Sequence, residues 1–93
     1  MKGKHVLATT KHRGVFFGKL VKEDGDTITL ADARNCLYWS SDCKGFLGLA
    51  KTGPTSRCRI GPAALKLKLR NVTSTAECTE EAVKAWEAAP WSA

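Results

Sequence analysis

The chain has 93 residues, of which 43% are hydrophobic and 26% charged, and its net charge is +6. This length and composition predict one domain, residues 1–93, and exclude a fibrous or disordered chain. No apolar run reaches the roughly 18 residues of a membrane span, and the N-terminus lacks the apolar core of a signal peptide, so we expect a cytoplasmic protein.

The N-terminal part of the chain shows the pattern of three antiparallel strands. Residues 4–10 and 14–23 are rich in β-branched and aromatic residues, with turn formers between them. The Asp-Gly pair at 24–25 is the strongest short hairpin signal, and apolar and polar residues alternate in TITLADA at 27–33. A short fourth strand is predicted at CLYW, residues 36–39.

The middle of the chain breaks this pattern. Residues 44–62 contain four glycines and two prolines, and GFLGLA within them is too short and glycine-rich to be a stable helix by itself. We therefore predict a long irregular loop. Alternation returns at residues 65–78, where three leucines are predicted to face the core and three basic residues the opposite side. These are Leu65, Leu67 and Leu69, and Lys66, Lys68 and Arg70, respectively.

A helix is predicted from about Thr79 to Ala89. Thr79 is a suitable N-cap, and Pro90 ends the helix. Glu80 and Glu81 lie in the first turn, where the helix dipole favours negative charge. The predicted fold class is therefore α+β: a small, mainly antiparallel β-sheet with a long irregular loop and one C-terminal helix.

The titratable residues show no metal-binding or catalytic pattern. The chain has no Cys-x-x-Cys pair, and its two histidines, His5 and His12, lie far from the cysteines in sequence and are predicted to be surface residues. We interpret the four cysteines as reduced thiols. GPTSR is not a Walker loop, and no motif couples a histidine to a nucleophile. We expect no metal, no cofactor, no catalytic residue and no enzyme activity.

The long loop has the composition of a binding site. Residues 43–76 carry seven basic residues and no acidic one, which favours an anionic ligand, although a basic surface that only keeps the protein soluble is an equal alternative. Hydroxyls and cations bind phosphate, and aromatic rings stack on nucleobases. The candidate ligand-binding residues are Tyr38, Trp39, Ser40, Lys44, Thr55, Ser56, Arg57 and Arg59.

The chain resembles a family of short proteins encoded by tailed bacteriophages and prophages. The shared sequence motifs are GVFFG, DARNC-x-YWS, KG-x-x-GLA-x-TGPTS and AW-x-x-AP, and the resemblance covers nearly the whole chain. Small phage proteins of this size include sponges, homo-oligomers that sequester the cyclic oligonucleotide signals of bacterial antiviral systems such as CBASS without cleaving them. This chain is similar to them in size and charge, which implies immune evasion in the host cytoplasm.

These observations give one leading hypothesis and two alternatives. The leading hypothesis is a non-enzymatic binder of a cyclic di- or trinucleotide, assembled as a homo-oligomer such as a dimer or tetramer. The first alternative is a nucleic-acid-binding phage accessory protein that uses the same basic surface. The basic strand face of Lys66, Lys68 and Arg70 could contact a nucleic-acid backbone or the same small anion, and lysines on an exposed strand edge also protect against aggregation. The second alternative is an inhibitor of a host protein that acts through the aromatic loop.

Overall fold

The computed structural model describes residues 2–11 and 14–90. His12 lies outside these residues, so its predicted surface position is not tested. The strands are β1 (His5–Thr10), β2 (Val15–Asp24), β3 (Thr27–Tyr38), β4 (Arg59–Ile60), β5 (Ala64–Leu69) and β6 (Val72–Glu77). The helices are the 3-10 helix η1 (Ser41–Cys43), α1 (Gly45–Lys51) and α2 (Glu80–Ala88).

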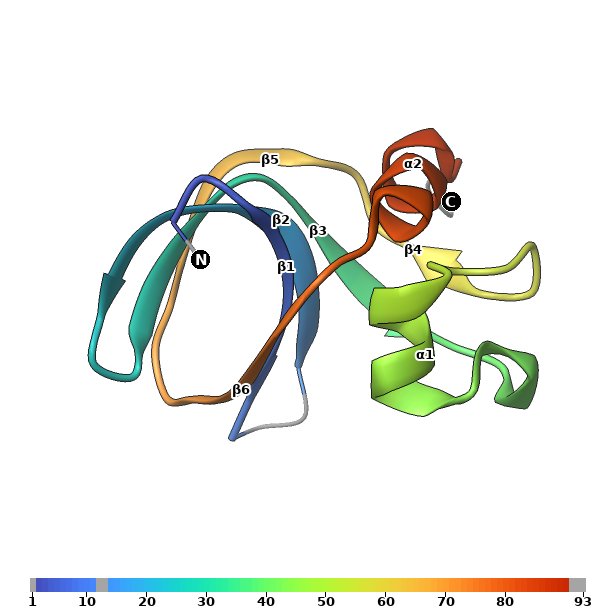
Figure 1. The fold of residues 1–93 in the computed structure, drawn as a ribbon, viewed down its shortest axis with the longest axis horizontal. Coiled ribbons are helices and arrows are strands. Elements are labelled where there is room, and N and C mark those ends of the chain that lie inside the picture. Colours follow the sequence, from blue (N-terminus) through green and yellow to red (C-terminus); the bar gives the residue numbers. More distant parts are fainter. Residues whose placement is uncertain (1, 12–13, 91–93) are drawn as a thin grey trace.

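All strand pairs among the described residues are antiparallel, and β3 pairs with three other strands, β2, β4 and β5. The strand order is β4-β3-β2-β1-β6, and β5 also pairs with β3. A turn at Asn71, whose φ is 59°, carries the chain from β5 to β6, which lies beside β1. The sheet therefore curves around an interior, with both α-helices on one side of the curve (Figure 1).

Two bulges bend β2 and β3. Their register shifts between Phe17 and Lys19 and again between Leu20 and Lys22, and Asp32, opposite the first shift, has a φ of 50°. Bulges increase local twist and bend a strand. The bends let one sheet enclose an inner core and also present its other face to the helices.

The core consists of two clusters on opposite faces of the sheet. Because side chains alternate along a strand, Val6 and Ala8 of β1 belong to the inner cluster while Leu7 packs in the cluster next to the helices, and all three are fully buried. Phe17 and Trp86 fill the helix-side cluster. The N-terminal strand is thus buried on both faces.

The predicted C-terminal helix is confirmed as α2. The Thr79 hydroxyl accepts a hydrogen bond from the Ala82 amide at 3.1 Å, as expected of an N-cap. Ala82 and Trp86 are buried against the sheet. Among the described residues, no helix is long and apolar enough to cross a membrane.

The prediction of a single helix is wrong, because GFLGLA belongs to α1. Its stability comes from tertiary contacts that the local sequence does not reveal. Leu49 and Ala50 are buried, the Trp86 indole donates to the Leu49 carbonyl at 3.1 Å, and the Thr79 hydroxyl donates to the Lys51 carbonyl.

Two strand predictions are also corrected. CLYW is not a separate fourth strand, because its first three residues end the long strand β3. The predicted strand at 65–78 is divided into β5 and β6, and Leu65 does not face the core but is 81% exposed. Leu69 is buried and Leu67 partly buried, as predicted.

Candidate nucleic-acid interface

The pairing of β3 with β4 brings three predicted ligand-binding residues together. Tyr38 lies opposite Arg59 in the β3–β4 register, and Trp39 follows Tyr38 directly. The Tyr38 and Trp39 residues are 54% and 37% exposed, and Arg59 is also exposed. We call Tyr38, Trp39 and Arg59 the aromatic edge, because they offer two rings and a guanidinium group to solvent.

Two other predicted residues are engaged within the loop. The Ser40 and Thr55 hydroxyls both bond to Asp42 Oδ1, and Ser40 is buried. The Ser40 hydrogen bond, followed by those of Thr55 and the charge of Arg57, lowers the pKa of Asp42 below its ordinary value. No pattern in the sequence indicates this role of Asp42 in ordering the loop.

The remaining predicted residues are at the surface. Lys44 joins η1 to α1 with a φ of 65°, and the Arg57 amide donates to the Thr55 hydroxyl at 3.3 Å. Lys44, Ser56 and Arg57 are exposed. Among the described residues, none of the eight predicted ligand-binding residues lines any of the three cavities that stand out in the structure.

One of these cavities is a basic groove on the outer face of the sheet. Its volume is about 210 Å³. The register aligns Lys22, Thr29 and Lys68 in one row across β2, β3 and β5, so two ammonium groups flank a hydroxyl. The groove is lined by Lys22, Asp24, Thr27, Thr29, Lys68 and Arg70.

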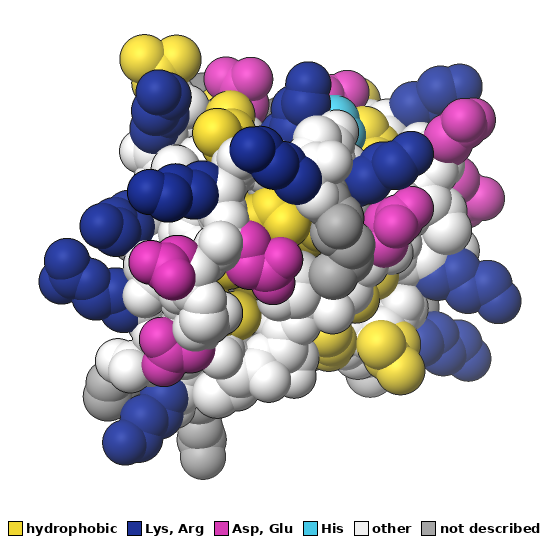
Figure 2. All heavy atoms as spheres, turned by 60° about the vertical axis from the view of Figure 1, so that its left-hand side comes forward, with side chains coloured by type: hydrophobic (Ala, Val, Ile, Leu, Met, Phe, Trp, Pro, Cys, Tyr) yellow, Lys and Arg dark blue, Asp and Glu magenta, His cyan; other side chains and the backbone are white. Residues whose placement is uncertain are grey.

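The charge extends beyond the groove along the same face. The next row of the register is Lys19, Ala31 and Lys66, and both lysines are exposed. This confirms that Lys66, Lys68 and Arg70 point away from the core. We call Lys19, Lys22, Lys66, Lys68 and Arg70 the basic face. Figure 2 shows Lys and Arg side chains at both sides and across the upper part of the view, interspersed with acidic side chains.

Like charges gathered on one face of a protein repel one another. On the basic face, Lys19 and Lys22 of β2 and Lys66 and Lys68 of β5 lie on the two sides of β3, and Arg70 directly follows β5. Asp24 is the one carboxylate that lines the groove. A bound anion would relieve this repulsion, and phosphate oxygens can accept hydrogen bonds from both ammonium groups and threonine hydroxyls. The chemistry of the basic face is therefore that of a phosphate-binding surface.

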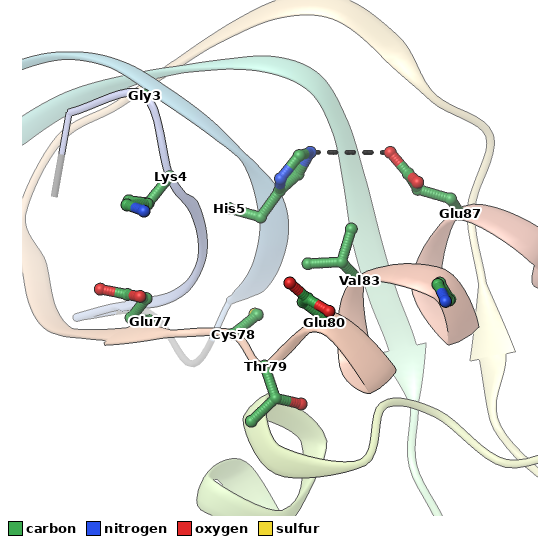
Figure 3. Close-up of a pocket in the computed structure, with 10 residues that line it drawn as sticks. Gly3, Lys4, His5, Glu77, Cys78, Thr79, Glu80, Val83 and Glu87 are labelled. Atoms are coloured by element: carbon green, nitrogen blue, oxygen red, sulfur yellow. Dashed lines mark ion pairs between the residues drawn. The ribbon is translucent and has the colours of Figure 1, made fainter.

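A larger cavity lies between β1, β6 and α2 and was not predicted. It has a volume of about 510 Å³. The His5 ring stacks on Phe17 with ring centroids 5.5 Å apart. Its Nε2 lies 3.6 Å from a carboxylate oxygen of Glu87 (Figure 3). These contacts leave the His5 side chain only partly exposed. The cavity lining includes three glutamates against two lysines, which disfavours phosphate. These are Glu77, Glu80 and Glu87, and Lys4 and Lys84.

The part of the chain that the structure describes contains no candidate metal site. Within residues 2–11 and 14–90, no three His, Cys, Asp or Glu side chains form a group that could hold a metal ion.

Comparison with known proteins identifies a family and a fold. The chain belongs to the family described as Domain of unknown function (DUF6948), whose family model matches residues 3–86. No curated protein matches the chain. Among solved structures, it is similar to a heptameric archaeal Sm protein, with a TM-score of 0.54, 17% identity, and coverage of 84% of this chain and 90% of that one. The fold is therefore Sm-like and mainly β.

Proposed function

We propose that this protein binds nucleic acid through the basic face and catalyses no reaction. The observation that supports the proposal is the row of Lys22, Thr29 and Lys68 across three paired strands, beside a groove of about 210 Å³. The face continues through Lys19 and Lys66 in the next row of the register. A surface of repeated cations suits the repeated phosphates of a polynucleotide better than one small anion.

The separation of the basic groove from the aromatic edge favours a polymeric ligand. Thr29 and Tyr38 lie nine residues apart on β3, which corresponds to roughly 30 Å of strand. A small ligand bound at one place would not reach the other along this strand. A nucleic-acid strand could contact the groove with its phosphates and stack a base on Tyr38 or Trp39.

The binding test measures salt and length dependence. We expect fluorescence anisotropy with labelled DNA and RNA to show affinity that rises with oligonucleotide length and falls linearly on a log–log plot against salt. The triple variant Lys22→Gln, Lys68→Gln, Arg70→Gln should reduce the slope by about 2 to 3, because each lost phosphate contact removes about 0.7 to 0.9.

A control variant separates this surface from net charge alone. Lys11→Gln, Lys51→Gln, Lys84→Gln removes the same charge from exposed positions outside the basic face. It should keep the wild-type slope. An equal loss of slope in both triple variants would show that binding does not depend on the basic face.

Sequestration of a cyclic oligonucleotide is a second candidate function, with a role in phage immune evasion. It is favoured by the aromatic edge, where Arg59 lies opposite the exposed ring of Tyr38. Calorimetry with cyclic di- and trinucleotides tests it. Binding that is lost in Tyr38→Ala and Arg59→Ala, but kept in the basic-face triple variant, would favour this candidate over nucleic acid.

Self-association is part of the proposal, because two different strand edges are open. In the described residues, β5 pairs only with β3 and β6 only with β1. Open edges are templates for pairing with another chain, and pairing of unlike edges gives a head-to-tail assembly that can close into a ring. The Sm protein to which this fold is similar is heptameric. A ring would place several basic faces in one assembly.

We expect size-exclusion chromatography with light scattering to give a molar mass that is a multiple of the 10.1 kDa of one protomer. Leu65→Lys should weaken it, because Leu65 is 81% exposed on the edge strand β5 and a charge there opposes strand pairing. Leu47→Lys, at a 72% exposed position on α1, is the matched control. A wild-type protein that stays monomeric at every concentration contradicts self-association.

A further inference from the structure

Two cysteines of the long loop are in direct contact. The Sγ atoms of Cys43 and Cys58 lie 2.9 Å apart, although the residues are 15 positions apart in sequence. We propose that Cys43 and Cys58 form a thiol–disulfide exchange site that reacts with a low-molecular-weight disulfide and becomes an internal disulfide bond.

Local turns on both sides hold the two sulfur atoms together. The Cys43 amide donates to the Ser40 carbonyl at 3.1 Å, and the Cys58 amide donates to the Thr55 carbonyl at 3.0 Å. A disulfide bond is about 2.05 Å long, so the sulfurs need to approach by only about one ångström. Cys43 and Cys58 are both free cysteines in this structure.

The surroundings distinguish the two thiols. Burial and then the hydrogen bond with Cys58 raise the pKa of Cys43, which is 1% exposed. Burial alone would raise the pKa of Cys58, but hydrogen bonds from the Cys43 thiol and from Ser40 and Thr55 lower it overall. Since the thiolate is the nucleophile, the half-buried Cys58 is the attacking residue and Cys43 the resolving one.

The other two cysteines are poor competitors for the same reagent. Burial is the main cause that raises the pKa values of Cys36 and Cys78 to about 12, and both residues are buried. They carry very little thiolate near neutral pH. The reaction is therefore expected to be selective for the Cys43–Cys58 pair.

The reaction proceeds by two exchanges. The Cys58 thiolate attacks one sulfur of the disulfide RSSR, the S–S bond of the reagent breaks, and RS⁻ leaves. The Cys43 thiol then gives its proton to RS⁻ and attacks Cys58 Sγ, which displaces the second RS⁻; this takes a proton from solvent. In sum, two protein thiols are oxidised to one disulfide and RSSR is reduced to two RSH.

The product would constrain the loop that contains α1. It would tie the end of η1 to the residue before β4, where Arg59 lies opposite Tyr38. Closing a loop restricts the unfolded chain, so oxidation should stabilise the fold and fix the aromatic edge. This holds whichever ligand the protein binds.

The test uses the full chain in glutathione buffers that range from reducing to oxidising. After rapid alkylation, mass spectrometry should find a Cys43–Cys58 peptide lighter by two hydrogen atoms, with Cys36 and Cys78 alkylated only after denaturation. The melting temperature of the oxidised protein should rise by several degrees. Free thiols at both positions in oxidising buffer, or equal modification of all four cysteines, would overturn the proposal.

Single variants test the order of attack. Cys43→Ser should stop at a mixed disulfide between Cys58 and glutathione, whereas Cys58→Ser should leave Cys43 unmodified. Cys78→Ser, between β6 and α2, should still form the internal disulfide. The reverse pattern, with glutathione trapped on Cys43, would contradict the assigned roles. If a serine variant fails to fold, the wild-type peptide map alone decides whether the disulfide forms.

Discussion

Replacing Trp86 by alanine is expected to lower the free energy of unfolding by about 3 to 5 kcal/mol. Trp86 of α2 is fully buried, and its ring stacks on Phe17 of β2 with centroids 5.2 Å apart and an interplanar angle of 3°. Its indole nitrogen donates to the Leu49 carbonyl of α1 at 3.1 Å. One side chain thus joins both helices to the sheet, and its removal leaves a cavity where they meet.

Urea unfolding followed by circular dichroism measures this loss. Trp39→Ala is the control, because Trp39 is 37% exposed and should cost less than about 1 kcal/mol. Trp86→Phe keeps a ring but loses the hydrogen bond, so an intermediate loss is expected if Trp86→Ala is too unstable to measure. Equal stability of Trp86→Ala and Trp39→Ala would show that Trp86 does not join the helices to the sheet.

The elements predicted correctly from sequence are those with local signals. The N-cap Thr79, the acidic residues after it and Pro90 mark α2 without reference to the rest of the chain. The helix α1 has no such signals: its N-cap residue is Lys44, with no side-chain capping hydrogen bond. It forms where Leu49 and Ala50 are buried. Contacts between distant segments determine whether this helix forms, and sequence patterns do not reveal such contacts.

The basic face could be predicted only in part. Alternation in LKLKLR correctly places Lys68 and Arg70 on the outer side, but the contribution of Lys22 depends on a register that includes two bulges. The same alternation fails for Leu65, because the core does not extend to the beginning of β5. A pattern with period two fixes the face of a residue, while burial depends on what lies over that face.

The contact between Cys43 and Cys58 also has no signal in the sequence. Their spacing matches no metal-binding motif, and because the sequence shows no secretory signal, it indicates that all four cysteines are reduced thiols. Turns at Ser40 and Thr55 create the contact. It therefore becomes visible only when the path of the loop is known.

A buried arginine, Arg34, is a second residue that fixes α2 against the sheet. Arg34 of β3 is 7% exposed. Its Nε donates to the Gly61 carbonyl at 2.9 Å, and its Nη1 donates to the Trp86 and Ala89 carbonyls at 2.8 and 2.6 Å. Burial lowers the pKa of Arg34 from its ordinary value, but a guanidinium group stays charged in proteins.

The position of this charge suits the end of the helix. The last turn of α2 contains no basic residue, and the carbonyl groups there form the negative end of the helix dipole. Arg34 supplies the missing cation from a neighbouring strand and pairs carbonyl groups that the helix itself leaves free. It also donates to the carbonyl of Gly61, directly after β4, so it couples three segments of the chain.

We therefore expect Arg34→Met to lower the free energy of unfolding by about 3 kcal/mol, because carbonyl groups lose a charged donor and the hydrophobic side chain cannot replace it. Arg34→Lys should lose less, since one ammonium group can keep some of these bonds. Urea unfolding gives the free energies, and faster amide exchange in the last turn of α2 locates the effect. Arg59→Met, at an exposed position, should change stability by no more than about 0.5 kcal/mol. An Arg34→Met variant as stable as that control, with unchanged exchange, would mean that packing alone holds the end of α2.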